Sequence, residues 1–175
     1  MIRWLIILLF VLLNVLNMIF SQNFLEDIVD KYANGKVKQI NYHQKYQNNM
    51  FIAKEEHYYR NGQLKQEINY NRNEKKDGKY REFYENGKIE TEKYYEDGEE
   101  EGKSIEYHEN GNIYYQGYYK HGDKEGKWTE YFENGKIENE IYYKEGEKEG
   151  KWTEYFENGQ KHCEGNTRHG RIHIV

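Results

Sequence analysis

Imidazole and thiol groups gather near the C-terminal end of the chain, in the segment "HCEGNTRHGRIH". The segment contains His162, Cys163, His169 and His173, and such groups are the preferred ligands of zinc. Strand alternation, however, predicts that the adjacent His162 and Cys163 point to opposite faces of a strand. No pair of these residues has the spacing of a known zinc motif. We therefore predict no metal site and no cofactor.

Three other patterns resemble catalytic motifs, and each has a simpler interpretation. The segment "GEKEGKW" at Gly146–Trp152 has the letters of a phosphate-binding loop, but three residues separate its glycines instead of four, and no Ser or Thr follows. Ser104 is the only serine after residue 21, and it occupies a position that is aromatic in other repeats. Glutamates such as Glu130 and Glu154 recur with the repeat, and no two of them stand out as a catalytic pair. We predict that the protein is not an enzyme.

These residues are placed by a tandem repeat. The string "WTEYFENG" occurs at Trp128–Gly135 and again at Trp152–Gly159, 24 residues later. Asn-Gly pairs recur through the chain and supply the predicted turn glycines, which are Gly62, Gly87, Gly111, Gly135 and Gly159. The chain holds about six such units, degenerate toward the N-terminus. This period is typical of proteins in which each unit packs only on its neighbours.

Each unit is predicted to be a β-hairpin. Asn-Gly between alternating residues favours a two-residue type I′ turn, which needs φ > 0 at both positions. The predicted cross-strand pairs are Glu133 with Lys136, Phe132 with Ile137, Tyr131 with Glu138, and Trp128 with Ile141. The second turn, at Lys144–Lys151, is expected to be longer. The predicted fold is therefore all-β, an elongated antiparallel meander of tandem β-hairpin repeats.

The register assigns aromatic side chains to two faces of the sheet. One face is predicted to carry a structural aromatic ladder of Tyr80, Trp128, Trp152, Tyr84, Phe132 and Phe156. The other is the candidate binding face, with Tyr107, Tyr131, Tyr155, Tyr118 and Tyr142. Because short exported repeats rich in Trp and Tyr also bind cell-envelope glycans or choline groups by stacking, a glycan-binding module remains an alternative.

The segment "EGKWTEYFENGKIENEIYYKEG" resembles the MORN repeat, specifically the variant found in tandem in bacterial antitoxin-like proteins. The pattern is matched in full at Gly126–Gly146, and at Gly102–Gly122 it holds with Ser104 and His108 at aromatic positions. The resemblance implies rows of β-hairpins that act as scaffolds or membrane-associated platforms. It assigns no functional role to particular residues, because the residues that define the motif are structural.

The first 21 residues differ from the rest of the chain. A single basic residue, Arg3, precedes an almost unbroken apolar run over residues 4–20, which predicts a helical signal peptide or membrane anchor. We expect four regions: 1–21, the signal or anchor; 22–56, an N-terminal lead with one degenerate repeat; 57–170, the tandem hairpin repeats; and 171–175, a closing strand. The protein is expected to be exported to the periplasm, the outer surface or the medium, or membrane-anchored through residues 4–20 if that segment is not cleaved.

Composition narrows the class of partner. The chain has 19 tyrosines, seven phenylalanines and three tryptophans, which is unlike a disordered segment. Without residues 1–21, 25 basic residues stand against 31 acidic ones, finely mixed, so we expect no nucleic-acid partner. The single cysteine excludes an intramolecular disulfide.

The predicted function is an exported, non-enzymatic scaffold for a protein partner; the alternatives are a cell-envelope glycan-binding module and an antitoxin-like protein that neutralises a toxin.

Overall fold

The computed structural model describes residues 24–168 and 171–174, with the side chains of residues 24–167. These residues form one antiparallel sheet, and no helix occurs among them. The strands are β1 (Phe24–Lys31), β2 (Val37–Tyr46), β3 (Asn49–Tyr58), β4 (Leu64–Tyr70), β5 (Lys76–Phe83), β6 (Ile89–Glu96), β7 (Glu99–Glu100), β8 (Gly102–Tyr107), β9 (Ile113–Lys120), β10 (Asp123–Tyr131), β11 (Ile137–Lys144), β12 (Glu147–Tyr155), β13 (Lys161–Arg168) and β14 (Arg171–Ile174). Neighbouring strands follow chain order throughout, except that the short β7 pairs only with β6. The predicted all-β antiparallel meander is confirmed for this part of the chain.

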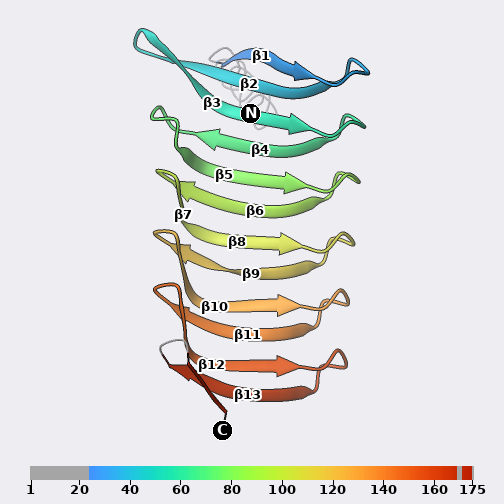
Figure 1. Ribbon diagram of the computed structural model, residues 1–175, viewed down its shortest axis with the longest axis vertical. Coiled ribbons are helices and arrows are strands. Elements are labelled where there is room, and N and C mark those ends of the chain that lie inside the picture. Colours follow the sequence, from blue (N-terminus) through green and yellow to red (C-terminus); the bar gives the residue numbers. More distant parts are fainter. Residues whose placement is uncertain (1–23, 169–170, 175) are drawn as a thin grey trace, which may run out of the picture.

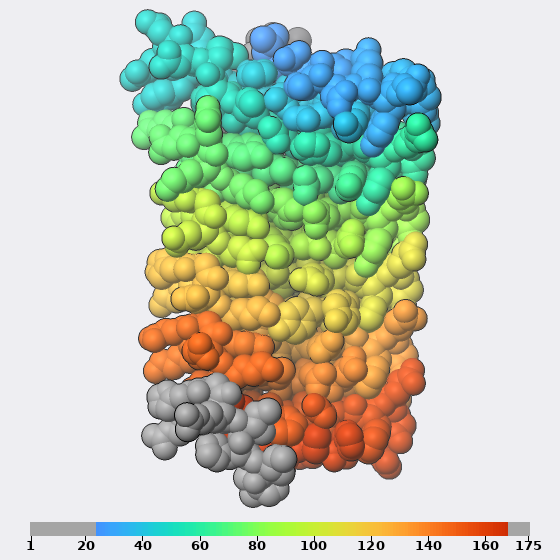
Figure 2. Space-filling model, viewed as in Figure 1, coloured from blue at the N-terminus to red at the C-terminus, as the bar shows by residue number. Residues whose placement is uncertain are grey.

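The hairpins stack along the long axis of the molecule, with β1 at one end and β13 and β14 at the other (Figure 1). In the space-filling view the units form successive bands of a slab (Figure 2). All Asn-Gly turns lie along one side of the stack, which we call the Asn-Gly edge, and the remaining turns lie along the opposite side (Figure 1). A side chain at a given repeat position therefore lies beside its counterpart in the next unit.

The sequence predicts a signal or anchor helix at one end of the chain and a closing strand at the other. The apolar residues 1–21, predicted to form a signal or anchor helix, lie outside the described residues. Across the described ranges, no helix is long and apolar enough to cross a membrane. At the other end, β14 pairs antiparallel with β13, with Gly165 opposite Ile174, where a closing strand was expected.

The Asn-Gly turns are longer than predicted. In the turn of residues 132–136, the Gly135 N–H donates to the Phe132 carbonyl (2.8 Å) and the Phe132 N–H donates to the Lys136 carbonyl (2.9 Å). Gly135 has a φ of 81°, whereas Asn134 is not in the positive-φ region. This is a three-residue loop, a type I turn followed by a left-handed glycine, so the predicted two-residue type I′ turn is wrong here. Asparagine serves instead through its side chain, because Asn134 Oδ1 accepts the Lys136 N–H (2.9 Å).

The two-residue turns occur at the opposite edge. Glu145 and Gly146 have φ values of 50° and 79°, and the flanking Lys144 pairs directly with Glu147. Positive φ at both central residues is the mark of a type I′ turn. The expectation of a longer turn at Lys144–Lys151 is therefore wrong. The additional residues lie after the turn, where the register between β11 and β12 shifts.

The cross-strand register is as predicted far from the Asn-Gly turn and different beside it. Trp128 faces Ile141, as expected, but Tyr131 pairs with Ile137 instead of Glu138. The three-residue turn moves the register by one position, and a β-bulge at Glu138 moves it back. Strand alternation beyond the bulge therefore gives the predicted faces.

The two faces of the sheet are named after their aromatic residues. The Trp face carries Tyr80, Tyr95, Tyr115, Tyr119, Trp128, Ile141, Tyr143 and Trp152, together with Glu82, Glu106, Glu130 and Glu154. The Tyr face carries Tyr94, Tyr118, Tyr142, Tyr107, Tyr131 and Tyr155, together with Lys79, Lys103, Lys127, Glu92 and Glu140. Buried apolar side chains are few: Ala53, Ile68, Tyr80 and Trp128. With so thin a core, the stability of the described sheet must come largely from contacts between successive units.

Candidate functional site

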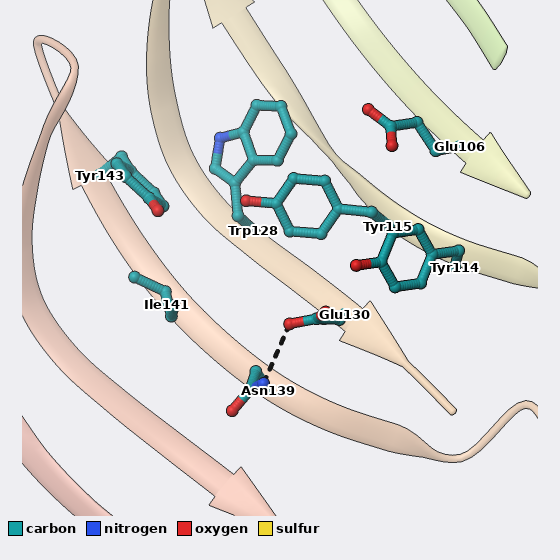
Figure 3. A pocket seen from close by; sticks show the side chains of 8 residues that line it. All are labelled: Glu106, Tyr114, Tyr115, Trp128, Glu130, Asn139, Ile141 and Tyr143. Atoms are coloured by element: carbon teal, nitrogen blue, oxygen red, sulfur yellow. Dashed lines mark hydrogen bonds between the residues drawn. The ribbon is translucent and has the colours of Figure 1, made fainter. Parts of the chain in front are cut away.

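The best-packed part of the Trp face surrounds Trp128, whose side chain is 1% exposed (Figure 3). Its indole lies directly on Gly117, where a Cβ atom would be 2.1 Å from the indole Cδ2. Tyr115 and Tyr119 flank it with ring centroids at 4.8 and 5.0 Å. Trp128 is thus a core residue, and its ring has no open face on which a ligand could stack.

The protein supplies its own cation to this aromatic cluster. The Lys124 Nζ lies 4.4 Å from the ring centroid of Trp128 and 4.8 Å from that of Tyr115. It also lies 5.3 Å from the ring of Tyr143. Burial lowers the pKa of the Lys124 ammonium. A quaternary-amine ligand at this position would have to displace Lys124.

An open hollow of about 370 Å³ adjoins the cluster on the same face (Figure 3). Carboxylates line part of it, and Asn139 Nδ2 donates to Glu130 (2.9 Å). Burial, followed by repulsion from Glu130, raises the pKa of the neighbouring Glu138. Ser104, on the neighbouring strand β8, is buried. The hollow is open to solvent, and the glutamates that line it, Glu106 and Glu130, are half-buried.

The residues of the predicted aromatic ladder occupy two different environments. Tyr80 is buried and Trp152 is half-buried, both in the row that contains Trp128. The others lie at the Asn-Gly edge: Tyr84 and Phe132, which are half-buried, and Phe156. Phe156 is 48% exposed, because it belongs to the last Asn-Gly turn and no later turn among the described residues covers it.

A hydrogen-bond ladder at this edge was not anticipated from the sequence. The Tyr32 hydroxyl donates to the Tyr58 carbonyl (2.8 Å), and the Tyr59 hydroxyl donates to the Phe83 carbonyl (2.7 Å) of the next unit. In the next two units the Tyr84 hydroxyl donates to the Tyr107 carbonyl, and His108 Nε2 donates to the Tyr131 carbonyl. The signal was present in the repeat, because this position carries a donor in four successive units and phenylalanine only in the last two.

Asparagine side chains link the same turns. Asn61 Nδ2 donates to the Glu85 carbonyl (3.0 Å), and Asn110 Nδ2 donates to the Glu133 carbonyl (2.9 Å), each in the following turn. The turn glycines Gly62, Gly87, Gly111, Gly135 and Gly159 all have positive φ. The asparagines of the four turns from Asn61 to Asn134 therefore shape their own turns and attach them to the next one.

The Tyr face presents an exposed column of tyrosines at the same repeat position. Tyr94, Tyr118 and Tyr142 are 45%, 56% and 43% exposed. They pair across the strands with lysines, Tyr118 with Lys103 and Tyr142 with Lys127. Two units along the chain separate Tyr94 from Tyr142, and a unit spans two strand spacings of about 4.8 Å each. Tyr94 was missed as a candidate binding residue, although it occupies the same position as Tyr118 and Tyr142.

The other predicted binding tyrosines form a second, half-buried column: Tyr107, Tyr131 and Tyr155. The hydroxyls of two of them bond within the sheet: Gln116 Nε2 donates to Tyr131 Oη (2.6 Å), and Tyr155 Oη donates to Glu140 (3.3 Å). A shallow hollow of about 340 Å³ lies between the columns and is lined in part by Lys103, Tyr118 and Tyr131. The five predicted tyrosines thus share one face, with one column exposed and the other fixed.

One group of side chains has the composition of a metal site. The ligand atoms of Glu154, His162 and Cys163 all lie within 4.8 Å of one another. The expectation that strand alternation separates His162 from Cys163 is wrong, because a register shift between β12 and β13 interrupts the alternation at this point.

Comparison with known proteins agrees with this architecture. No curated protein matches the chain. The sequence model described as the MORN repeat variant matches five tandem segments, residues 53–72, 76–98, 100–121, 124–145 and 148–169. Each segment lies on the two strands of one hairpin and includes the Asn-Gly turn that joins them. Since the matches span more than half of the chain, this protein belongs to the MORN repeat variant family.

Proposed function

We propose that this protein is a non-enzymatic scaffold that binds a protein partner through its Tyr face. MORN repeats are commonly protein- or membrane-interaction modules, and the family is generally non-catalytic. The observation that carries the proposal is the exposed column of Tyr94, Tyr118 and Tyr142. Tyrosine is enriched at protein interfaces because it offers a large apolar ring and a polar tip for little conformational entropy.

The surroundings of the column favour a protein partner over a polyanion. Two of the three lysines that define the Tyr face are paired with acids, Lys79 with Glu92 (3.1 Å) and Lys127 with Glu140. Lys54 bridges Glu56 and Glu67 at 2.7 and 2.8 Å. A surface of exposed rings among neutralised charges offers apolar contact and hydrogen bonds, with little net field to attract phosphates.

The rigidity of the sheet supports the same conclusion. Successive turns are joined at the Asn-Gly edge by the hydroxyl and asparagine bonds, and at the other edge by backbone bonds such as Gly122 N–H to the Glu100 carbonyl (2.9 Å). A partner therefore meets tyrosines whose spacing is preset, which lowers the entropy cost of binding. On the Trp face the largest ring, that of Trp128, is 1% exposed and is therefore not available to a partner.

We extend the proposal to location: the chain acts outside the cytoplasm or at a membrane. This part depends on the sequence alone, on Arg3 and the apolar residues 4–20. N-terminal sequencing of the protein from fractionated cells tests it. A chain that begins near Gln22 in an envelope or external fraction supports export, and an intact Met1 in the cytosol contradicts it.

Site-specific photocrosslinking tests the binding face. A photoreactive phenylalanine analogue replaces Tyr118 or Tyr142 in the cells that make the protein, and Tyr114 on the Trp face is the matched control because it is also an exposed tyrosine. We expect a discrete protein adduct from both Tyr-face positions and none from Tyr114. Adducts from Tyr114 alone, or from no position, would contradict the proposal.

A binding measurement completes the test once the adduct is identified. The variant that combines Tyr94→Ser, Tyr118→Ser and Tyr142→Ser should bind the purified partner at least ten-fold more weakly, a change of about 1.4 kcal/mol. Tyr114→Ser should bind within two-fold of the parent. Circular dichroism of each variant confirms that the sheet is intact.

A further inference from the structure

A thiol, an imidazole and a carboxylate converge at the end of the Trp face, between β12 and β13. Cys163 Sγ donates to Glu154 Oε2 at 3.1 Å. His162 Nδ1 lies 3.8 Å from the same oxygen. The three groups come from adjoining strands next to the last Asn-Gly turn, so the backbone that holds them is part of the sheet (Figure 1).

A β-bulge brings the two neighbours together. Glu154 pairs with Cys163 and Tyr155 pairs with Lys161, so His162 is the additional residue on β13. Such a bulge re-aims the side chain that strand alternation would otherwise send to the other face. The Phe156 ring lies against the His162 ring, with centroids 4.2 Å apart, and it restricts the orientation of the imidazole.

The same bulge recurs in earlier units with different chemistry. In the preceding unit the bulged residue is Glu138, and Asn139 takes the place of Cys163 opposite Glu130. One unit earlier, Tyr114 and Tyr115 occupy these two positions. Of the units that the structure describes, only that of β12 and β13 sets both a thiol and an imidazole beside the repeated glutamate. The departure from the repeat needs an explanation other than the fold, because the fold is the same in all these units.

We propose that Glu154, His162 and Cys163 bind one zinc ion. Zinc takes thiolate, imidazole and carboxylate ligands at about 2.3, 2.0–2.1 and 2.0–2.2 Å in a tetrahedron. Such bond lengths put neighbouring ligand atoms roughly 3.3–3.8 Å apart, which is close to the two separations seen at Glu154 Oε2. The partly exposed side chains close the remaining gap by rotation. Water fills the fourth position, and the thiol proton passes to solvent on binding because the thiolate is the ligand.

Of the other histidines of the C-terminal segment, the structure describes His173, and its backbone lies away from this set. His173 pairs with Asn166, three residues from Cys163 along β13, a separation of about 10 Å at the usual rise per residue. His169 lies outside the described residues. The site therefore draws its protein ligands from Glu154 on β12 and from the bulge on β13.

Cobalt spectroscopy of the reduced full chain tests the proposal. Co²⁺ alone is titrated into the chain, and a thiolate-to-cobalt charge-transfer band with one ion per chain is expected, because thiolate suits such metals. Zn²⁺ should then displace the cobalt. Absence of the charge-transfer band in the parent chain would overturn the proposal.

Variants separate this site from adventitious binding by the chain's seven histidines. Cys163→Ser should abolish the charge-transfer band, and Glu154→Gln and His162→Gln should each weaken binding at least ten-fold. Glu130→Gln is the matched control, since Glu130 occupies the same repeat position beside Asn139, and its affinity should stay within two-fold. Equal affinity in Glu154→Gln and Glu130→Gln would contradict the assignment. Zn²⁺ should also raise the urea midpoint of the parent and leave that of Cys163→Ser unchanged.

Discussion

Gly117 lies in β9 beneath the indole of Trp128, and its replacement by alanine probes the tightest contact of the sheet. The added Cβ would be 2.1, 2.3 and 2.6 Å from three ring atoms of Trp128. Unlike the turn glycines, Gly117 is not in the positive-φ region, so its backbone accepts any residue. Space alone therefore requires glycine at this position.

The expected magnitude follows from the burial of Trp128. A buried aromatic side chain removes on the order of 200 Å² from water, and at about 25 cal/mol per Å² its burial contributes about 5 kcal/mol. The methyl group forces the ring off its position, and Tyr115 and Tyr119 leave it little room to move. We expect Gly117→Ala to lower the free energy of unfolding by roughly 2–4 kcal/mol, between simple overpacking and the loss of the whole side chain.

A double-mutant cycle makes the reasoning refutable. With Trp128→Ala the space above Gly117 is empty, and alanine should then be neutral or stabilise by about 0.4–1 kcal/mol, because it restricts the unfolded chain. The sign of the Gly117→Ala effect is thus expected to depend on residue 128. Urea unfolding followed by circular dichroism measures all four proteins without relying on tryptophan fluorescence. A similar loss of stability in both backgrounds would refute the steric argument.

Two further predictions concern the edge ladder and alkaline pH. Tyr59→Phe removes the hydroxyl bond to the Phe83 carbonyl and should lower the free energy of unfolding by about 0.5–1.5 kcal/mol. Phe132→Tyr should raise it, because the new hydroxyl can make the equivalent bond to the next unit. Urea midpoints that move in the same direction for both variants would contradict this. Burial raises the pKa of Tyr70 and Tyr119 to about 12, above the value of 10.0 for an unperturbed tyrosine. The folded state therefore keeps protons that the unfolded state loses, so this stabilisation is complete below pH 10 and disappears as the pH rises toward 12. The free energy of unfolding should be lower at pH 11 than at pH 8, and an equal value at both would count against the burial of these rings.

The hairpin architecture could be predicted because the positions of turns and strands in one repeat can be compared with those in the next. Glycines and aromatic pairs that return every 24 residues require a repeated structure, and Asn-Gly between alternating residues favours a hairpin. The pairing of Trp128 with Ile141 followed from counting outward from the turn. Counting succeeded there although the turn was wrong, because the longer turn and the bulge at Glu138 offset each other.

The sequence by itself determined the period, the antiparallel hairpins and, away from the bulges, which strand residues share a face, because these depend on local turn preference and on strand alternation. Only the tertiary structure decided the contacts that reach across units, since they depend on which residues become neighbours when hairpins stack. The ring of Trp128 over Gly117, the ammonium of Lys124 among three aromatic rings, and the hydroxyl ladder at the Asn-Gly edge are of this kind. The bulge that sets His162 beside Cys163 is another, because a bulge cancels the alternation from which their separation was predicted.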